Sequence, residues 1–148
     1  MVKNDEKKIR FDWRKNDDEK LINELLLIMY KNKADYTNTF CLLMNENIKK
    51  NNMHNDVNYS NWYKRWKERR EANNNSLKES LKLMRSVNPL VIPRNHKVEE
   101  VLEAASMDDL QPFNDFLEVL KKPYENQTNT DNYIAPSFEK KYQTFCGT

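Results

Sequence analysis

The sequence predicts an all-α fold: a single helical domain of about six helices, followed by an extended C-terminal tail. Apolar residues recur at the spacing of an amphipathic helix in six segments of the 148-residue chain. The one glycine, Gly147, leaves no glycine-dependent two-residue hairpin, which disfavours an antiparallel β architecture. Residues from Tyr124 onward show no helical period, and we place the helical domain at residues 1–132 and the tail at residues 133–148.

The first three helices are expected in the N-terminal half of the chain. Residues 17–31 carry a broad apolar stripe behind an acidic start, which suits the positive end of a helix dipole. A second helix is expected from residue 37 to about residue 50, because apolar residues repeat at helical spacing there. A third is expected from Tyr59 to about Ala72, where three consecutive asparagines follow.

The fourth helix is predicted by its capping residues. Ser76 and Glu79 have the spacing of a capping box, in which each side chain hydrogen-bonds the backbone of the other residue. The residues expected to face the core from this helix are Leu77, Leu81 and Met84. Pro89 and Pro93 follow, and proline restricts both itself and the residue before it, so this segment must be extended or turned.

Two further helices are expected before the tail. Asn95 is expected to cap the fifth helix, and Asp108 or Asp109 the sixth. Pro112 is tolerated in the first turn of the sixth helix, and Pro123 stops it. The inner faces are predicted to comprise Val98, Val101, Leu102 and Ala105 in the fifth helix and Leu110, Phe113, Phe116, Leu117 and Leu120 in the sixth.

The composition excludes several function classes. Lys and Arg number 25 against 23 Asp and Glu, so neither a nucleic acid nor a membrane is required as a partner. No apolar run reaches the length of a membrane-spanning helix. One glycine at the penultimate position cannot form a phosphate-cradling loop, so the chain has no recognisable nucleotide-binding loop. Two cysteines, Cys41 and Cys146, do not make a disulfide framework, and we expect a cytoplasmic protein.

Charge is unevenly distributed along the chain. Residues 59–85 contain eight Lys and Arg against three acidic residues, whereas residues 98–120 contain seven acidic residues and no Lys or Arg. The two segments either attract each other or form separate solvated faces. Alternatively, one of these charged faces docks on a larger partner.

Basic and aromatic residues interleave in residues 61–70, as they do in some proteins that stack single-stranded bases on aromatic rings. Trp62 and Trp66 are four residues apart and share a helix face with Tyr59, so we interpret this segment as a helix that contributes to the core. Its basic residues are then expected in solvent: Lys64, Arg65, Lys67 and Arg69.

The remaining chemically versatile side chains form no recognisable site. Neither His54 nor His96 stands at the spacing of a metal-ligand pair. Adjacent carboxylates such as Asp17 and Asp18 diverge by about 100° on a helix, so they suit a helix start better than a shared substrate. Cys41 lies beside an apolar stripe and is expected to be a buried, inert thiol. We therefore predict no catalytic, cofactor-binding or metal-binding residue in this chain.

Four blocks of sequence together resemble the C-terminal part of the selenoprotein O family, also called YdiU or UPF0061. They are ADYTNTFCLLM (residues 34–44), WYKRWKERR (residues 62–70), the block from MRSVNPLVIPRNH to LKKPY (residues 84–124) and YIAPSFEKKYQTFCGT (residues 133–148). The NPLVIPRNH motif, followed by an acidic helix and an aromatic tail with a cysteine, is the specific part of this resemblance.

The resemblance implies the C-terminal region of a kinase-like enzyme that transfers AMP from ATP to Ser, Thr or Tyr hydroxyls of other proteins. The family's Gly-rich loop, nucleotide-binding Lys and metal ligands cannot be placed on residues 1–148, so ATP and Mg²⁺ are implied for the full-length protein only. This chain alone is expected to be inactive. Many family members carry a Cys or selenocysteine near the C-terminus that is linked to redox control, and Cys146 matches it. A disulfide would need Cys41 or an upstream partner.

The leading hypothesis is therefore a C-terminal helical fragment of a selenoprotein O-like protein AMP-transferase, with the missing kinase-like core as its partner. The alternative is a free-standing helical module that binds another protein. A third hypothesis, a single-strand nucleic-acid binder, rests only on the tryptophan helix. A domain cut from a larger enzyme should expose a contiguous apolar surface, or cover it by forming a homo-oligomer, and we expect residues 89–93 to take part.

Overall fold

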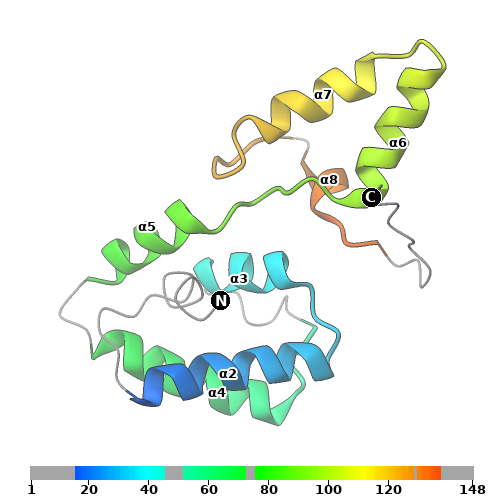
Figure 1. The fold of residues 1–148 in the computed structure, drawn as a ribbon. Helices are drawn as coiled ribbons and strands as arrows, with labels where there is room; N and C mark the ends of the chain where they lie inside the picture. Colours follow the sequence, from blue (N-terminus) through cyan, green and yellow to red (C-terminus); the bar gives the residue numbers. More distant parts are fainter. Residues whose placement is uncertain (1–15, 46–51, 73–75, 129, 138–148) are drawn as a thin grey trace. The chain divides into compact units, whose positions relative to one another are not determined.

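The computed structural model describes residues 16–45, 52–72, 76–128 and 130–137. Within these residues the regular secondary structure is helical and no strand occurs, so the all-α class is confirmed (Figure 1). The helices are α2 (Asn16–Lys31), α3 (Tyr36–Met44), α4 (Val57–Glu71), α5 (Leu77–Val87), α6 (Asn95–Ser106), α7 (Gln111–Leu120) and α8 (Asp131–Ile134). In this part of the chain no helix is long and apolar enough to cross a membrane.

The chain divides into two compact units, which we call the N-terminal unit (Met1–Pro89) and the C-terminal unit (Leu90–Thr148). The boundary falls in the proline-containing segment after α5, where the sequence predicts extended or turned backbone. That the helices of residues 1–132 make one domain stays a prediction. The sequence-predicted tail begins at residue 133, but Tyr133 and Ile134 lie in α8, and residues 138–148 lie outside the described part.

The core of the N-terminal unit is formed where α4 packs on α2 (Figure 1). Tyr59, Trp62 and Trp66 are fully buried along one side of α4, each 0% exposed. The indole Nε1 of Trp62 donates a hydrogen bond of 2.7 Å to the carbonyl oxygen of Leu21, which ties the two helices together. The helix that the sequence identifies from its tryptophan spacing is thus the central element of this unit.

Side-chain caps set the starts of three helices in the N-terminal unit. The carboxylate of Asp35 accepts from the backbone N–H of Asn38 at the start of α3, and Asp56 caps α4 in the same way. The predicted capping box between Ser76 and Glu79 is confirmed, with both hydrogen bonds present. Leu77 was expected to face the core but is exposed, because it begins the helix beside this solvent-facing box.

The second predicted helix is shorter than expected. It was expected to reach about residue 50, but α3 ends at Met44 and Asn45 is its C-cap. Asparagine favours helix caps and turns over helix interiors, because its side chain competes for backbone hydrogen bonds. Of the expected continuation, residues 46–51 lie outside the described part of the chain.

Two helices end in a left-handed residue that is not glycine. Lys33 follows α2 with φ 51°, and Asp108 follows α6 with φ 64°. After α6, the N–H of Asp109 donates to the carbonyl of Ala104 at 3.1 Å and that of Asp108 to Ala105 at 3.2 Å. These are the two bonds of a Schellman motif, in which glycine is the usual left-handed residue. In this chain, Lys and Asp occupy a position that glycine usually fills.

In the C-terminal unit α6 packs against α7, with Val101 and Phe116 buried between the elements of this unit. The ring of Tyr133 in α8 stacks on Phe116 at a centroid distance of 5.0 Å. The N–H of Leu90 donates to the carbonyl of Pro123 at 2.7 Å, which joins the start of the unit to the end of α7. The core of this unit is therefore small and includes elements far apart in the sequence.

Two capping predictions in the C-terminal unit are wrong. Arg94, not Asn95, is the N-cap of α6 and makes no side-chain capping bond. Leu110 is the N-cap of α7, because Asp108 is used to end α6 instead. The Asp109 carboxylate still accepts from the N–H of Gln111 at 3.2 Å. Asp109, which precedes the N-cap Leu110 by one residue, thus accepts a hydrogen bond of the kind that a capping side chain makes.

Candidate functional site

The single residue to which the sequence assigns a redox role, Cys146, lies outside the described residues. The other cysteine, Cys41, was expected to be a buried thiol and is half-buried in α3. Its thiol donates to the carbonyl oxygen of Pro89 at 3.4 Å. This contact places Cys41 against the last residue of the N-terminal unit, so the thiol is held by the fold.

Three of the four aromatic side chains of α4 are buried in the core, and the fourth, Tyr63, is half-buried. Trp62 stacks on Trp66 at 5.8 Å with an interplanar angle of 9°, and Tyr59 stacks on Trp62 at 5.9 Å. All three rings are fully buried, which confirms the core interpretation of this segment. Bases cannot stack on buried rings, so Tyr59, Trp62 and Trp66 are not available to stack single-stranded bases.

The basic residues of α4 are paired more closely than the sequence suggests. Arg69 was expected in solvent, but its guanidinium binds the buried carboxylate of Asp18 through two hydrogen bonds of 2.7 and 2.9 Å. Arg65 is exposed and binds Glu24 of α2. The guanidinium of Arg70 is buried and lies 4.7 Å from the ring centre of Trp66, within cation–π distance. Arg65 and Arg69 thus link α4 to α2.

In the described residues neither histidine belongs to a group of side chains that could hold a metal ion. His54 is exposed in the turn before α4, and His96 is half-buried in the first turn of α6. Among these residues no group of three or more His, Cys, Asp or Glu side chains is placed to hold a metal ion.

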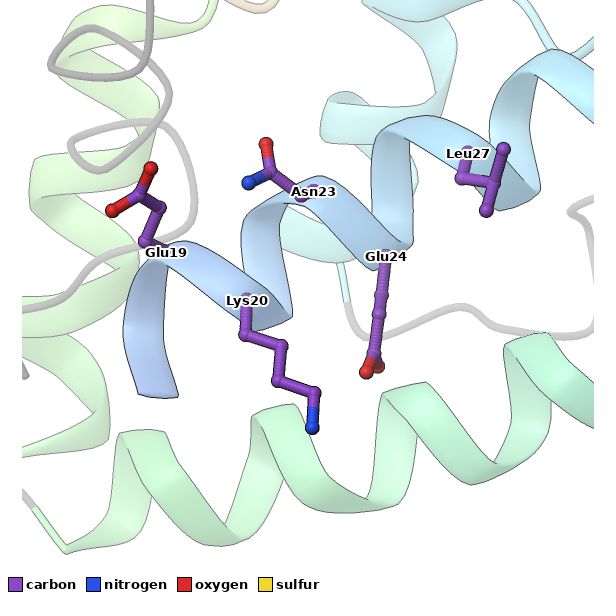
Figure 2. Close-up of a pocket in the computed structure, with 5 residues that line it drawn as sticks. All are labelled: Glu19, Lys20, Asn23, Glu24 and Leu27. Carbon is purple, nitrogen blue, oxygen red and sulfur yellow. The ribbon is translucent and has the colours of Figure 1, made fainter. Parts of the chain in front are cut away.

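An open hollow of about 430 Å³ lies along α2. Figure 2 shows its described lining, which is drawn from this one helix: Glu19, Lys20, Asn23, Glu24 and Leu27. In the same view Lys20 and Glu24 extend on the side of the helix where α4 lies (Figure 2). This hollow has the form of a surface groove.

A second hollow of about 380 Å³ lies between α2 and the start of α4. Its lining includes Asp56, whose carboxylate accepts from the Nδ2 of Asn32 at 2.7 Å and from the N–H of Asn58 at 2.8 Å. The hydrogen bond from Asn32, followed by that from Asn58, holds the pKa of Asp56 below its ordinary value of 3.8. A carboxylate already occupies the positive end of α4, so this hollow does not suit an anion.

The largest departure from the predicted core lies on α6 and α7. Five large apolar side chains there are exposed, and we call them the α6–α7 apolar face: Leu102, Met107, Leu110, Phe113 and Leu117. Four of them, all except Met107, were expected to face inward. Leu110 and Leu117 are 57% and 41% exposed, and with Phe113 they follow the i, i+3, i+7 spacing of one helical stripe. Two paired helices bury only the stripe between them, so the flank remains in solvent.

The width of the apolar surface on α7 could have indicated this exposure. Besides the buried Phe116, the half-buried Pro112, Val119 and Leu120 already fill the side of α7 that packs inward. The stripe of Leu110, Phe113 and Leu117 is additional, and a single neighbouring helix cannot cover both. The segment expected to contribute, residues 89–93, is mostly half-buried, with Val91 buried and Pro93 exposed. The arrangement can bind another apolar surface, and it carries no catalytic group.

Comparison with known proteins supports the resemblance seen in the sequence. The sequence model of a family described as protein adenylyltransferase SelO matches residues 6–121. The protein nucleotidyltransferase YdiU of Pelagibacter ubique is 44% identical over 134 residues, and that of Lachnoclostridium phytofermentans is 43% identical over 134 residues. The YdiU of Alcanivorax borkumensis is 40% identical over 145 residues. These matches cover 88–96% of this chain but only 28–30% of each relative's length.

Proposed function

The chain belongs to the protein adenylyltransferase SelO family, and we propose that it is the C-terminal helical part of such an enzyme. The proposal rests on two findings taken together. The chain is 40–44% identical to its relatives, but it matches only 28–30% of their length. The chain spans less than a third of the length of the relatives it matches. In the proposed full-length enzyme, a kinase-like core transfers AMP from ATP, with Mg²⁺, to hydroxyl groups of protein substrates in the cytoplasm.

In this proposal the chain supplies structure and binding surface, while nucleotide chemistry belongs to the core. The single glycine supports this division of roles, because it leaves no phosphate-cradling loop in the chain. The buried aromatic and arginine side chains of α4 stabilise the helical body. Cys146 is the residue proposed to respond to redox conditions.

The alternative, a free-standing protein-interaction module, is favoured by the α6–α7 apolar face alone. Exposed apolar stripes of this kind mark protein-binding surfaces in general. The two proposals differ in their partner: a core of the same family, or an unrelated protein. The match to the family across residues 6–121 favours the first.

Calorimetric titration of the isolated chain with ATP and Mg²⁺ tests the proposal that nucleotide binding belongs to the core. We expect no measurable heat of binding, and no transfer of labelled AMP to protein by the isolated chain. Binding with micromolar affinity would contradict the proposal, because the chain would then contain a nucleotide site of its own.

A further inference from the structure

We propose that the α6–α7 apolar face docks on the part of the enzyme that precedes this chain in its relatives, at an apolar surface with a basic rim. This inference rests on the proposed function and specifies its contact surface. The face comprises exposed residues of α6, α7 and the turn between them, all within the segment that matches the family.

The spacing of the exposed residues indicates an interface. Single exposed apolar side chains are normal on protein surfaces, but Leu110, Phe113 and Leu117 lie along one side of α7. Anchors at i, i+3 and i+7 are the pattern by which an amphipathic helix lies in an apolar groove. Leu102 of α6 and Met107 of the turn extend the exposed apolar surface beyond α7. The pattern therefore points to an interface rather than to isolated exposure.

The acidic residues around the face indicate the charge of the surface that it binds. Residues 98–120 contain seven acidic residues and no Lys or Arg, and the acidic side chains of α6 and α7 are exposed. Lys97 and Lys121, from outside this range, pair with Glu100 and Glu118 at 2.6 and 2.5 Å, which leaves a negative excess. The exposed acidic residues of α6 and α7 thus form an acidic rim around the apolar face. A partner with Lys or Arg around its apolar surface is attracted to this rim, and an acidic partner is repelled.

The length of the relatives indicates which surface covers the face. The relatives are more than three times as long as the region that this chain matches, so most of a family member's chain is available to cover the face. A second copy of this chain is the weaker candidate. In a two-fold symmetric dimer the same patch meets itself, which would place two acidic rims against each other. The preceding part of the enzyme is a different surface, so symmetry does not place a second acidic rim against this one.

The test uses a chimera in which this chain replaces the matching segment of the Pelagibacter ubique relative. The variant carries Leu110→Ser and Leu117→Ser, both at exposed positions, and is made in the chimera and in the isolated chain. In the isolated chain we expect the melting temperature to stay within about 1 °C of the unsubstituted value, because neither side chain is core. In the chimera we expect it to fall by at least about 3 °C, because both side chains lose buried contacts.

Leu27→Ser is the matched control, since Leu27 is a similarly exposed leucine, on α2. It should leave the melting temperature of the chimera unchanged. A charge variant, Glu99→Lys with Glu103→Lys, should lower that temperature at low salt and have a smaller effect at high salt, because salt screens exposed charges.

Three outcomes overturn the inference. In the first, the double leucine variant leaves an AMP-transferring chimera as stable as before; the proposed function then stands and the docking surface is wrong. In the second, Leu27→Ser destabilises the chimera as much as the double leucine variant does. In the third, light scattering shows a dimer of the isolated chain that the double leucine variant dissolves, which assigns the face to a second copy. A chimera that transfers no AMP counts against the proposed function itself.

Discussion

The carboxylate of Asp18 in α2 accepts two hydrogen bonds from the guanidinium of Arg69 in α4, from Nε at 2.7 Å and from Nη2 at 2.9 Å. The two residues are 51 positions apart, and the side chain of Asp18 is 5% exposed. A bidentate pair of this kind fixes both the distance and the rotation of one helix against the other. It lies at the opposite end of the α2–α4 contact from the capping interaction of Asn32 with Asp56.

Asp18→Asn should lower the free energy of unfolding by about 3 kcal/mol, because it leaves the Arg69 cation without its buried anion. Chemical denaturation with urea measures this. Glu24→Gln is the control: it breaks the exposed pair with Arg65 and should cost less than about 1 kcal/mol. Equal losses for the two variants would mean that the burial of Asp18 has no energetic consequence.

Lys33→Gly should raise the free energy of unfolding by about 0.5–1 kcal/mol. Lys33 has a left-handed backbone with φ 51°, a conformation in which a β-carbon is unfavourable and glycine is not. Lys33→Ala keeps the β-carbon and should give no gain, which separates the backbone effect from loss of the lysine charge. Thermal unfolding of the three proteins side by side decides the matter, and stabilisation by alanine would refute the explanation.

Stability should depend on the ionisation of Asp56. The hydrogen bonds from Asn32 and Asn58 lower the pKa of Asp56 from 3.8, so the folded state favours the carboxylate. The contribution of the Asp56 carboxylate to the free energy of unfolding is therefore complete above the ordinary pKa. It is lost as pH falls through the lowered pKa. The melting temperature of Asp56→Ala should lie below that of the unsubstituted chain at neutral pH, and the gap should narrow in acid.

The Asn32 contribution can be measured separately. Asn32→Ala removes the largest cause of the lowered pKa, so the pKa of Asp56 should move up towards 3.8. Carboxyl chemical shifts followed by NMR through the acid range report this directly. An unchanged pKa would show that the hydrogen bond between the two side chains has no role.

The two cysteines should differ in reactivity. Cys41 is half-buried and donates to the carbonyl of Pro89, so we expect slow modification by Ellman's reagent in the folded chain. Cys146, by its place in the sequence and its family resemblance, is expected to react much faster. Cys41→Ala and Cys146→Ala variants assign the two rates. Equal rates in the folded protein would contradict the proposed redox role of Cys146.

The helices themselves could be predicted from the sequence because their causes are local. The stripe of α2, the tryptophan spacing of α4 and the capping box of Ser76 and Glu79 each involve residues within a few turns. The ends of helices were harder to predict. Asp108 could cap the next helix or end the previous one, and only the left-handed backbone after α6 distinguishes the two roles.

The relationships that carry the functional argument depend on tertiary packing. Asp18 has the sequence context of a helix-start residue, and nothing near it indicates Arg69 as its partner. Likewise, Leu110 and Leu117 have the spacing of core residues, yet they are exposed because no described element of the C-terminal unit covers them. The periodicity correctly identifies an apolar face on α7, but it cannot show which molecule covers that face.

The most direct test of the account is AMP transfer by the chimera of this chain with the preceding part of the Pelagibacter ubique relative. Labelled ATP, Mg²⁺ and a protein acceptor are supplied, and labelled protein is counted for the chimera and for the isolated chain. The account predicts labelling by the chimera and none by the isolated chain, because the chain completes the enzyme without supplying its nucleotide site. Labelling by the isolated chain, or a folded chimera that labels nothing while the intact relative does, would contradict it.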